Sequence, residues 1–446
     1  MPLQRITCRS AFYRTFAPST NIIIMRTLIL SLFLLPLTAL AQTLEVCQQA
    51  AERNYPLILE YGLIEKSTEL TLSNICKGWL PQLSVSAQAT VQSDVTAFPP
   101  QMQALYEQMG LEMEGLGKGQ YRMGIDVQQT LYDGGNMESR KEVARRQSEL
   151  QAVQNEVKMY QVRRSVNEMY FSLLLVEAQI CLNDDLQRLL EANEQKLASM
   201  LQRGTAAESD WQLVKAERLS ARQQLTTLLS QRSALRRMLS TFCGIEVKDV
   251  EKPPMVQPET EARNLRPELK AIDAQLRLAD AQEKALAAAW RPKVGLFAQG
   301  YYGYPGYNLF EDMMKRTPSW NAMVGARLTW NIGALYTRRN DKAKIRLQRE
   351  SAEVGRERFL LENRMEQMEQ DENIMRYAKL MADDEEIIAL RQQVRKAAES
   401  KLEHGIIDVN DLLKEINGEN AARLGQAIHE IEMLKEIYDL KFTKNI

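Results

Sequence analysis

The sequence offers few side chains of the types that catalysis or metal binding requires. Its 446 residues include two histidines, His404 and His429, and neither is followed by a second histidine four residues later, as in a zinc-protease helix. The glycines at 115–119 lack the spacing of a phosphate-binding loop. The 20 methionines could bind a soft metal ion, but scattered methionines more often fill cores. The sequence therefore predicts no enzyme activity, no metal site and no cofactor.

One polar pattern does recur. Gly204 precedes Asp210, and Gly405 precedes Asp411, with five residues between them in both cases. A glycine that ends one helix and is followed within a few residues by another predicts a left-handed cap at a helical turn. In the second segment Asp408 is expected to cap the new helix, with Asp411 in its first turn near the positive end of the helix dipole. We call these glycine-to-aspartate segments the first tip and the second tip. Their aspartates either only cap helices or also have a functional role.

Long segments without glycine or proline flank the tips. Residues 136–203 and 205–243 contain neither residue type, and no proline follows Pro318. A helix over the first of these segments would be about 100 Å long. Apolar residues between Val162 and Ile180 are spaced alternately by four and three, which is typical of a coiled-coil seam. We therefore predict long helical hairpins, each turning at a tip.

The pattern occurs twice along the chain. A Trp-x-Pro motif ends at Pro81 and again at Pro292, and the segment LYDGG (131–135) corresponds to TWNIG (329–333). Self-similarity of this kind indicates a repeated structural unit. In each half the expected order is helix, strand, loop, strand, long helix, tip and helix.

The domain boundaries follow from this repeat and from an N-terminal leader. Arg26, the apolar run after it and the segment Ala39–Ala41 predict a secretory signal peptide, with a single-span anchor as the less favoured alternative and Met25 as a possible true start. The expected units are the signal peptide at 1–41, the first repeat at 42–242, a linker at 243–264 and the second repeat at 265–446.

Four segments alternate between apolar and polar residues with the period of a β-strand, and each is roughly as long as a tilted membrane strand. They begin near Leu83, Tyr121, Val294 and Trp320. We expect their apolar faces to meet lipid and their polar faces a lumen, with a half-buried soluble sheet as the alternative. The predicted lumen residues are Ser84, Ser86, Gln88, Asp126 and Arg327, and the predicted interfacial aromatics are Tyr301, Tyr302, Trp320 and Trp330.

Four strands cannot close a barrel, and lipid does not tolerate an open sheet edge. We therefore predict a homotrimer with twelve strands. The expected fold class is an α+β membrane protein, in which four transmembrane strands per chain contribute to a trimeric barrel continued by a long helical coiled-coil tunnel.

The leader, the paired Trp-x-Pro motifs, the LYDGG and TWNIG segments and the two tips together resemble the TolC family of outer-membrane efflux channels. The resemblance covers essentially the whole mature chain. It implies a location in the outer membrane of a Gram-negative-type bacterium with the helices in the periplasm, and passive export in a tripartite efflux or type I secretion system. It also implies a periplasmic adaptor (membrane fusion) protein and an inner-membrane pump of the RND or ABC type as partners, beside the lipid of the outer membrane.

The resemblance also suggests a role for the tips. In that family, acidic residues just past the second tip form the constriction of the periplasmic mouth, and Asp411 falls at such a position, with Asp210 at the corresponding place in the first tip. The chain departs from the family's closing network at Leu402, Ile407 and Lys414, so how the mouth is held closed is open.

Composition narrows the alternatives. A formal net charge of −1 argues against nucleic acid as a partner, and a charged fraction of 26% argues against a polytopic helical membrane protein. The remaining rival is a periplasmic coiled-coil adaptor or scaffold, which would need no membrane-length strands. Cys47 and Cys76 lie too far apart on one predicted helix to pair, so we expect the mature chain's cysteines to be free, buried thiols.

Overall fold

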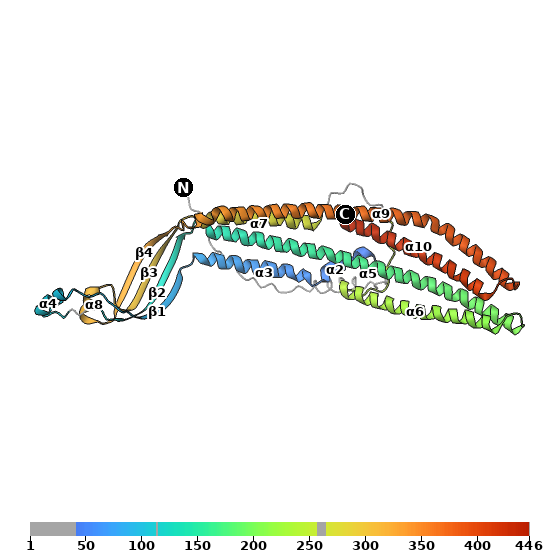
Figure 1. Cartoon of the computed structure of the whole chain (residues 1–446), viewed down its shortest axis with the longest axis horizontal. Helices are drawn as coiled ribbons and strands as arrows, with labels where there is room; N and C mark the ends of the chain where they lie inside the picture. The colour runs from blue at the N-terminus through green and yellow to red at the C-terminus, as the bar shows by residue number, and fades with distance from the viewer. Residues whose placement is uncertain (1–41, 113–114, 257–264, 446) are drawn as a thin grey trace, which may run out of the picture.

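The structure is a computed structural model that describes residues 42–112, 115–256 and 265–445. The predicted signal peptide, residues 1–41, lies outside the described residues, as does the end of the predicted linker. The molecule is elongated, with a sheet at one end and long helices that run away from it, ending in two tips (Figure 1).

The sheet contains the four predicted strands and confirms their alternation. They are β1 (Gln82–Val91), β2 (Gly119–Tyr132), β3 (Lys293–Tyr304) and β4 (Ser319–Thr329). All neighbours are antiparallel and the order is β1-β2-β3-β4. Directly opposed residues share a face of the sheet, so the pairs Val85–Ile125 and Ala298–Val324 place the apolar residues of all four strands on one face.

The central pair, β2 and β3, comes from different halves of the chain. The two halves therefore share one continuous sheet rather than forming separate ones. Strands β1 and β4 are its edges, and each has one partner strand within the described chain.

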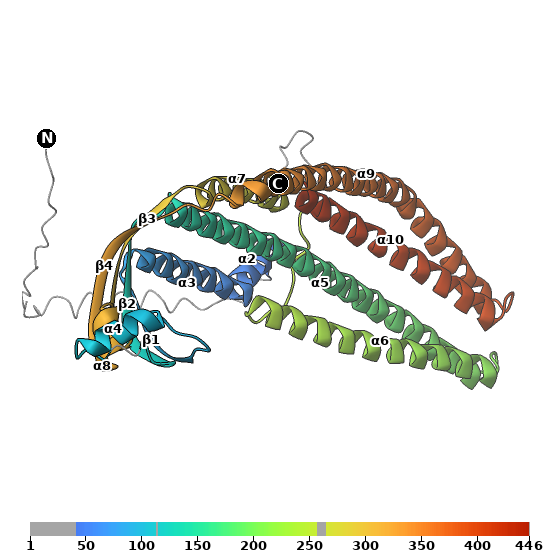
Figure 2. The same cartoon turned by 60° about the vertical axis from the view of Figure 1, so that its left-hand side comes forward.

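The long predicted helices are present. The helices are α2 (Leu44–Asn54), α3 (Leu57–Cys76), α4 (Pro100–Gln108), α5 (Asn136–Gln202), α6 (Glu208–Cys243), α7 (Pro267–Ala289), α8 (Leu309–Lys315), α9 (Ala334–Glu403) and α10 (Val409–Lys444). Helix α5 has 67 residues and α9 has 70. Helices α3 and α6 pack along successive parts of α5, and α7 and α10 pack along α9 (Figure 2). Two shorter helices therefore run end to end beside each long one.

The single helix predicted over residues 44–78 is wrong, because the chain breaks between α2 and α3 at Pro56. Tyr55 has extended backbone angles (φ −67°, ψ 135°), as expected of a residue that precedes proline. Proline also lacks the N–H that a continuous helix would use. The short helices α4 and α8, which lie in the loops between strands, were not predicted either.

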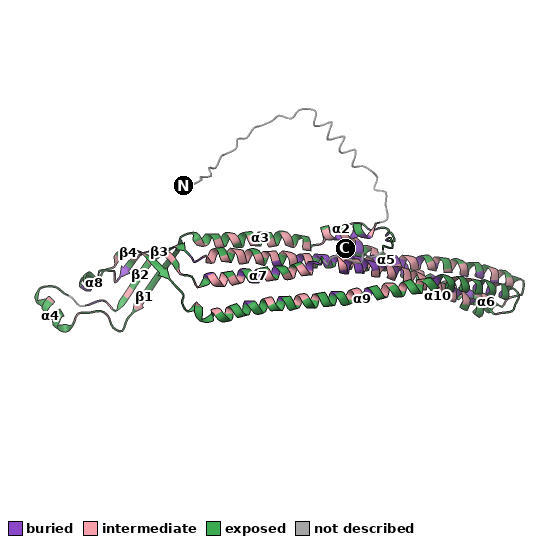
Figure 3. Ribbon diagram, turned by 90° about the horizontal axis from the view of Figure 1, so that it is seen from above, coloured by how far each residue is buried: buried purple, intermediate pink, exposed green. Residues whose placement is uncertain are grey.

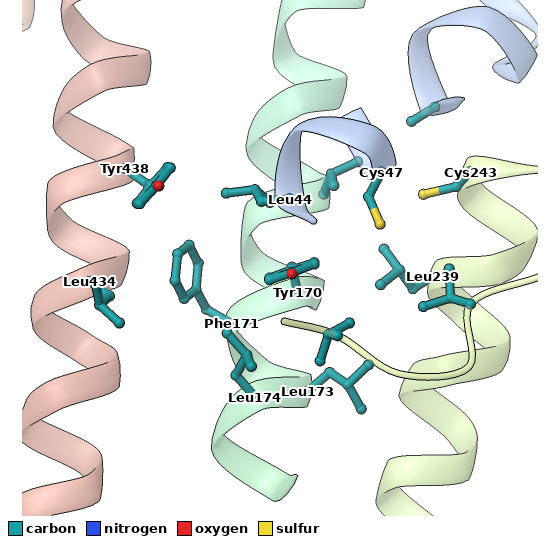
Figure 4. Close-up of a cluster of buried hydrophobic side chains, with 14 of the residues drawn as sticks. Leu44, Cys47, Tyr170, Phe171, Leu173, Leu174, Leu239, Cys243, Leu434 and Tyr438 are labelled. Atoms are coloured by element: carbon teal, nitrogen blue, oxygen red, sulfur yellow. The ribbon is translucent and has the colours of Figure 1, made fainter. Parts of the chain in front are cut away.

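The main hydrophobic core lies where α2, α5, α6 and α10 meet, midway along the molecule (Figure 4). Tyr170 and Phe171 of α5 are completely or almost completely buried there, against Leu434 and Tyr438 of α10. The Tyr170 hydroxyl lies 2.7 Å from the carbonyl oxygen of Gln42 and 2.6 Å from that of Glu251. The core therefore holds both the start of the described chain and the segment after α6.

Asp133 explains the LYDGG segment. Its carboxylate accepts hydrogen bonds from the backbone N–H groups of Gly135 (2.9 Å) and Met137 (2.5 Å), at the first turn of α5. Gly134 has a φ of +73°, and a Cβ at this position would lie 2.7 Å from the Cβ of Arg291. The segment therefore forms a tight, capped corner between β2 and α5. The corresponding corner at α9 has no side-chain cap.

Replacing Asp133 by alanine should destabilise the assembled protein by about 1 kcal/mol, because two N–H groups at the start of α5 lose their acceptor. Asn331→Ala, the matched change at the uncapped corner, should cost clearly less. Resistance to thermal denaturation in detergent, measured for both variants, checks this. Equal losses for the two variants would contradict the assignment of Asp133 as a cap.

Candidate functional site

The five predicted lumen residues lie on the same face of the sheet. Ser84 is opposite Asp126, and Gln88 is opposite Arg122, whose guanidinium donates a 3.1 Å hydrogen bond to the Gln88 amide oxygen. On the same face, in the β3–β4 half of the sheet, Arg327 lies over the ring of Phe297 at 4.8 Å from its centroid. This face, which we call the polar face, can therefore line a water-filled space.

The opposite, apolar face is strongly exposed in the single chain. The exposed fractions are 68% for Val85, 78% for Val324 and 68% for Leu328. None of the described helices covers these residues, because the long helices extend from one end of the sheet and the short helices α4 and α8 lie at its other end (Figure 3). An exposed apolar surface of this extent indicates contact with lipid or with another protein.

The four predicted interfacial aromatics do not share one location. Tyr302 and Trp320 pack together on the apolar face, with ring centroids 5.2 Å apart. Tyr301, the neighbouring residue in β3, points to the polar face and packs edge-on against Tyr307 at 5.3 Å. Trp330 follows the other end of β4, where its indole N–H donates to the carbonyl of Trp290. Aromatic residues therefore border the apolar face at both ends, but Tyr301 is not one of them.

Both tips have the predicted glycine caps. Gly204 and Gly405 have φ values of +73° and +69°. Beyond them, the N–H of Thr205 donates to the carbonyl of Met200, and that of Ile406 to the carbonyl of Lys401, both at 2.9 Å. These bonds satisfy carbonyl groups that the helix ends would otherwise leave unpaired.

The second tip is the better capped one, as predicted. The Asp408 carboxylate accepts a 2.9 Å hydrogen bond from the N–H of Asp411 and caps α10. Ala207, at the equivalent position of the first tip, cannot cap α6 through its side chain. Asp210 lies in the first turn of α6 and Asp411 in that of α10. The carboxylate of Asp411 is thus exposed at the end of the molecule, while Asp408 holds the helix.

Apolar packing joins the two hairpins just behind the tips. One buried cluster combines residues of all four helices at this end: Leu190 and Leu197 of α5, Val214 of α6, Leu402 of α9 and Leu412 of α10. Ile407 packs against the same cluster. Lys196 also forms an ion pair with Glu403 across the hairpins. Leu402 and Ile407 therefore contribute to an apolar contact between the two hairpins.

Sequence reasoning missed an apolar stripe along α9. The exposed residues Leu347, Val354, Leu361, Met368 and Met375 are spaced by sevens, the period of a coiled coil. Helix α3 carries a shorter stripe of Leu59, Leu63 and Leu70. This heptad signal was present in the sequence, but only the fold shows that neither stripe is covered by the chain's own helices.

The described residues include no group of three or more His, Cys, Asp or Glu side chains that could hold a metal ion. His404 contacts the carbonyl of Ser400 within its own helix, and His429 lies 2.8 Å from the carboxylate of Asp384. Among the described helices, none is both long and apolar enough to cross a membrane.

Residues 76–244 match the family described as outer membrane efflux protein. In fold, the chain is similar to the outer-membrane channel OprN (15% identity, TM-score 0.62, covering 90% of this chain and 89% of OprN). It is also similar to CusC (12%, 0.65, 91% and 92%) and to the outer membrane protein VceC of Vibrio cholerae (12%, 0.63, 90% and 94%). No curated protein matches the chain closely in sequence.

Replacing Asp408 by alanine should destabilise the second hairpin by about 1 kcal/mol, because the first turn of α10 loses its acceptor. Ala207→Asp should have the opposite sign, because it supplies the acceptor that the first tip lacks. Hydrogen exchange at the start of α6 and α10 measures both effects locally. Unchanged protection of α10 in Asp408→Ala would show that the cap contributes nothing.

Proposed function

We propose that three copies of the chain form the exit duct of a tripartite efflux or type I secretion system. The match of residues 76–244 to the outer membrane efflux protein family supports this proposal, as does the similarity in fold to outer-membrane channels. The family match agrees with the resemblance drawn from the sequence. It supports a location in the outer membrane and a role in efflux rather than in catalysis. We propose that the chain is a homotrimer. We also propose that its partners are a periplasmic adaptor and an inner-membrane pump of the RND or ABC type.

The observation that carries the proposal is the sheet with one exposed apolar face and two free edges. In lipid, unpaired backbone groups cost several kcal/mol each, so the edges must find strands. Pairing β1 of one copy with β4 of the next continues the sheet around a ring. Three copies supply twelve strands, with the apolar face outside and the polar face around a pore.

The helices support the same neighbour contact. Helix α3 leads to β1 and α9 follows β4, so the two uncovered apolar stripes lie on the same sides of the molecule as the two free edges. When β1 meets β4 of the next copy, α3 meets α9 of that copy, and both stripes become buried. A contact between two different surfaces that repeats in one direction forms a closed ring when its rotation divides a full turn, as a three-fold rotation does.

The proposed tunnel is long because α9 is long. At 1.5 Å per residue its 70 residues span about 105 Å. We propose that the tips end near the periplasmic adaptor, and that residues 42–242 and 265–446 are two repeats joined by 243–264. A periplasmic scaffold, the rival function, would not require the exposed apolar sheet face. Recovery of the protein in the soluble periplasmic fraction would favour that rival.

In a trimer, Asp411 would occur three times around the axis of the mouth. We propose that these carboxylates form a ring that attracts cations and opposes anions. Asp408 is committed to its cap, whereas the Asp411 carboxylate has no hydrogen-bond partner among the contacts that the structure gives it. A free carboxylate beside a capped helix start is what a selectivity ring would require.

The assembly should remain a trimer in mild detergent, as measured by light scattering, and a stable monomer would contradict the proposal. Val354→Lys, which places a charge in the α9 stripe, should lower the temperature at which the trimer dissociates. Glu353→Lys, the control, changes the charge at an adjacent position that is already polar and should have a small effect.

Val85→Arg should impair assembly into the membrane by about 2–4 kcal/mol if Val85 lies near the midplane, because it puts a charge on the lipid-facing side. Ser86→Arg, one residue away on the polar face, should be much milder. The yield of heat-resistant trimer in the outer-membrane fraction compares them. Equal defects would show that the assignment of the two faces is wrong.

Asp411→Asn should lower cation selectivity and weaken block by multivalent cations added from the periplasmic side. Asp185→Asn, which removes a carboxylate from α5 away from the tips, is the control and should leave both properties unchanged. Single-channel recording in planar bilayers measures the reversal potential and the block. If both stay at the wild-type values in Asp411→Asn, the ring is ruled out and Asp411 is a structural residue.

A further inference from the structure

Two cysteines that are far apart in the sequence meet in the main core. Cys47 lies in α2 and Cys243 is the last residue of α6, and both are 0% exposed. Figure 4 shows their sulfur atoms facing each other across the gap between the two helices. Both belong to the same buried cluster. Sequence reasoning considered Cys47 only with Cys76 and missed this pair.

Backbone contacts on both sides hold the two thiols in register. Before Cys47, the N–H of Gln42 donates to the carbonyl of Asp249 (2.9 Å), and the Gln42 amide donates to the carbonyl of Glu246 (2.7 Å). After Cys47, the Asn54 amide donates to the carbonyl of Cys243 itself (2.8 Å). These hydrogen bonds therefore fix the segment that contains Cys47 against the end of α6, which contains Cys243.

The surroundings are apolar and closed to solvent. Leu44, Leu239 and Val247 belong to the same buried cluster as the two cysteines. Interaction with Cys243, together with burial, raises the pKa of the Cys47 thiol, and interaction with Cys47 lowers the pKa of the Cys243 thiol.

We propose that Cys47 and Cys243 are joined by a disulfide bond in the exported protein. The proposal rests on export to an oxidising compartment, where disulfides persist, and not on the channel role. The reaction is exchange with a disulfide-bearing oxidant: one thiolate attacks a sulfur of the oxidant and releases a thiol. The second cysteine then attacks the mixed disulfide and releases the other. The chain loses two protons and two electrons, and the oxidant becomes a dithiol or two thiols.

The bond would join the start of the mature chain to the base of the first hairpin. Because both sulfurs are buried, the bond should be structural: it forms while the chain folds and is then protected from reductants in the native protein. Cys76 and Cys181, in contrast, are exposed in the single chain, which corrects the expectation that all the cysteines are buried.

The test uses the full-length protein extracted from outer membranes. It is unfolded with iodoacetamide and without reductant, digested and analysed by mass spectrometry. We expect alkylation at Cys76 and Cys181, and one cross-linked pair of peptides containing Cys47 and Cys243. Recovery of Cys47 and Cys243 in alkylated form, or bonded to other cysteines, would overturn the proposal.

A second measurement does not depend on digestion. When the protein is heated with a reductant, the wild type should unfold at a lower temperature than it does without the reductant. The Cys47→Ala/Cys243→Ala variant should unfold at the same temperature in both conditions. The Cys76→Ser/Cys181→Ser variant is the matched control and should respond like the wild type. An equal effect of reductant on all three proteins would also overturn the proposal. None of these readouts requires channel activity, so failure here would leave the proposed function untouched.

Discussion

The backbone of β1 and β4 sets the main constraint on this protein. Each strand has one free edge, and peptide groups in a lipid environment must all be hydrogen-bonded. The chain cannot satisfy them alone, so the proposed ring of copies is what would complete its sheet. In that ring the apolar stripes of α3 and α9, which lie on the same two sides, would also be buried. In the proposed assembly, pairing of the strands and formation of the pore therefore depend on each other.

Much of this arrangement could be predicted from local sequence. The strand alternation at Val85 and Val324 is a period-two pattern, and the helices around the tips follow from long segments without glycine or proline. The caps at Gly405 and Asp408 were predictable because capping depends on residues only a few positions apart. These are all features in which cause and effect lie within one or two helical turns.

Features that depend on distant contacts could not be predicted in the same way. Tyr301 and Tyr302 are an exception, because strand alternation alone sends neighbouring residues of β3 to different faces, and grouping both as interfacial aromatics overlooked this. The meeting of Cys47 with Cys243 depends on hydrogen bonds made by Gln42 and Asn54 to the segment around the end of α6. The break at Pro56 was a local signal that the helical periodicity on both sides obscured.

The pairing of β2 with β3 has a consequence for how the chain folds. Tyr121 is opposite Tyr304, so this part of the sheet cannot form until most of the chain has left the ribosome and crossed the inner membrane. Contacts between such distant residues form slowly, and exposed strand edges aggregate while they wait. The β1–β2 hairpin must therefore travel through the periplasm as an unfinished sheet with its apolar face uncovered. A holdase chaperone that binds extended apolar segments suits the needs of that intermediate.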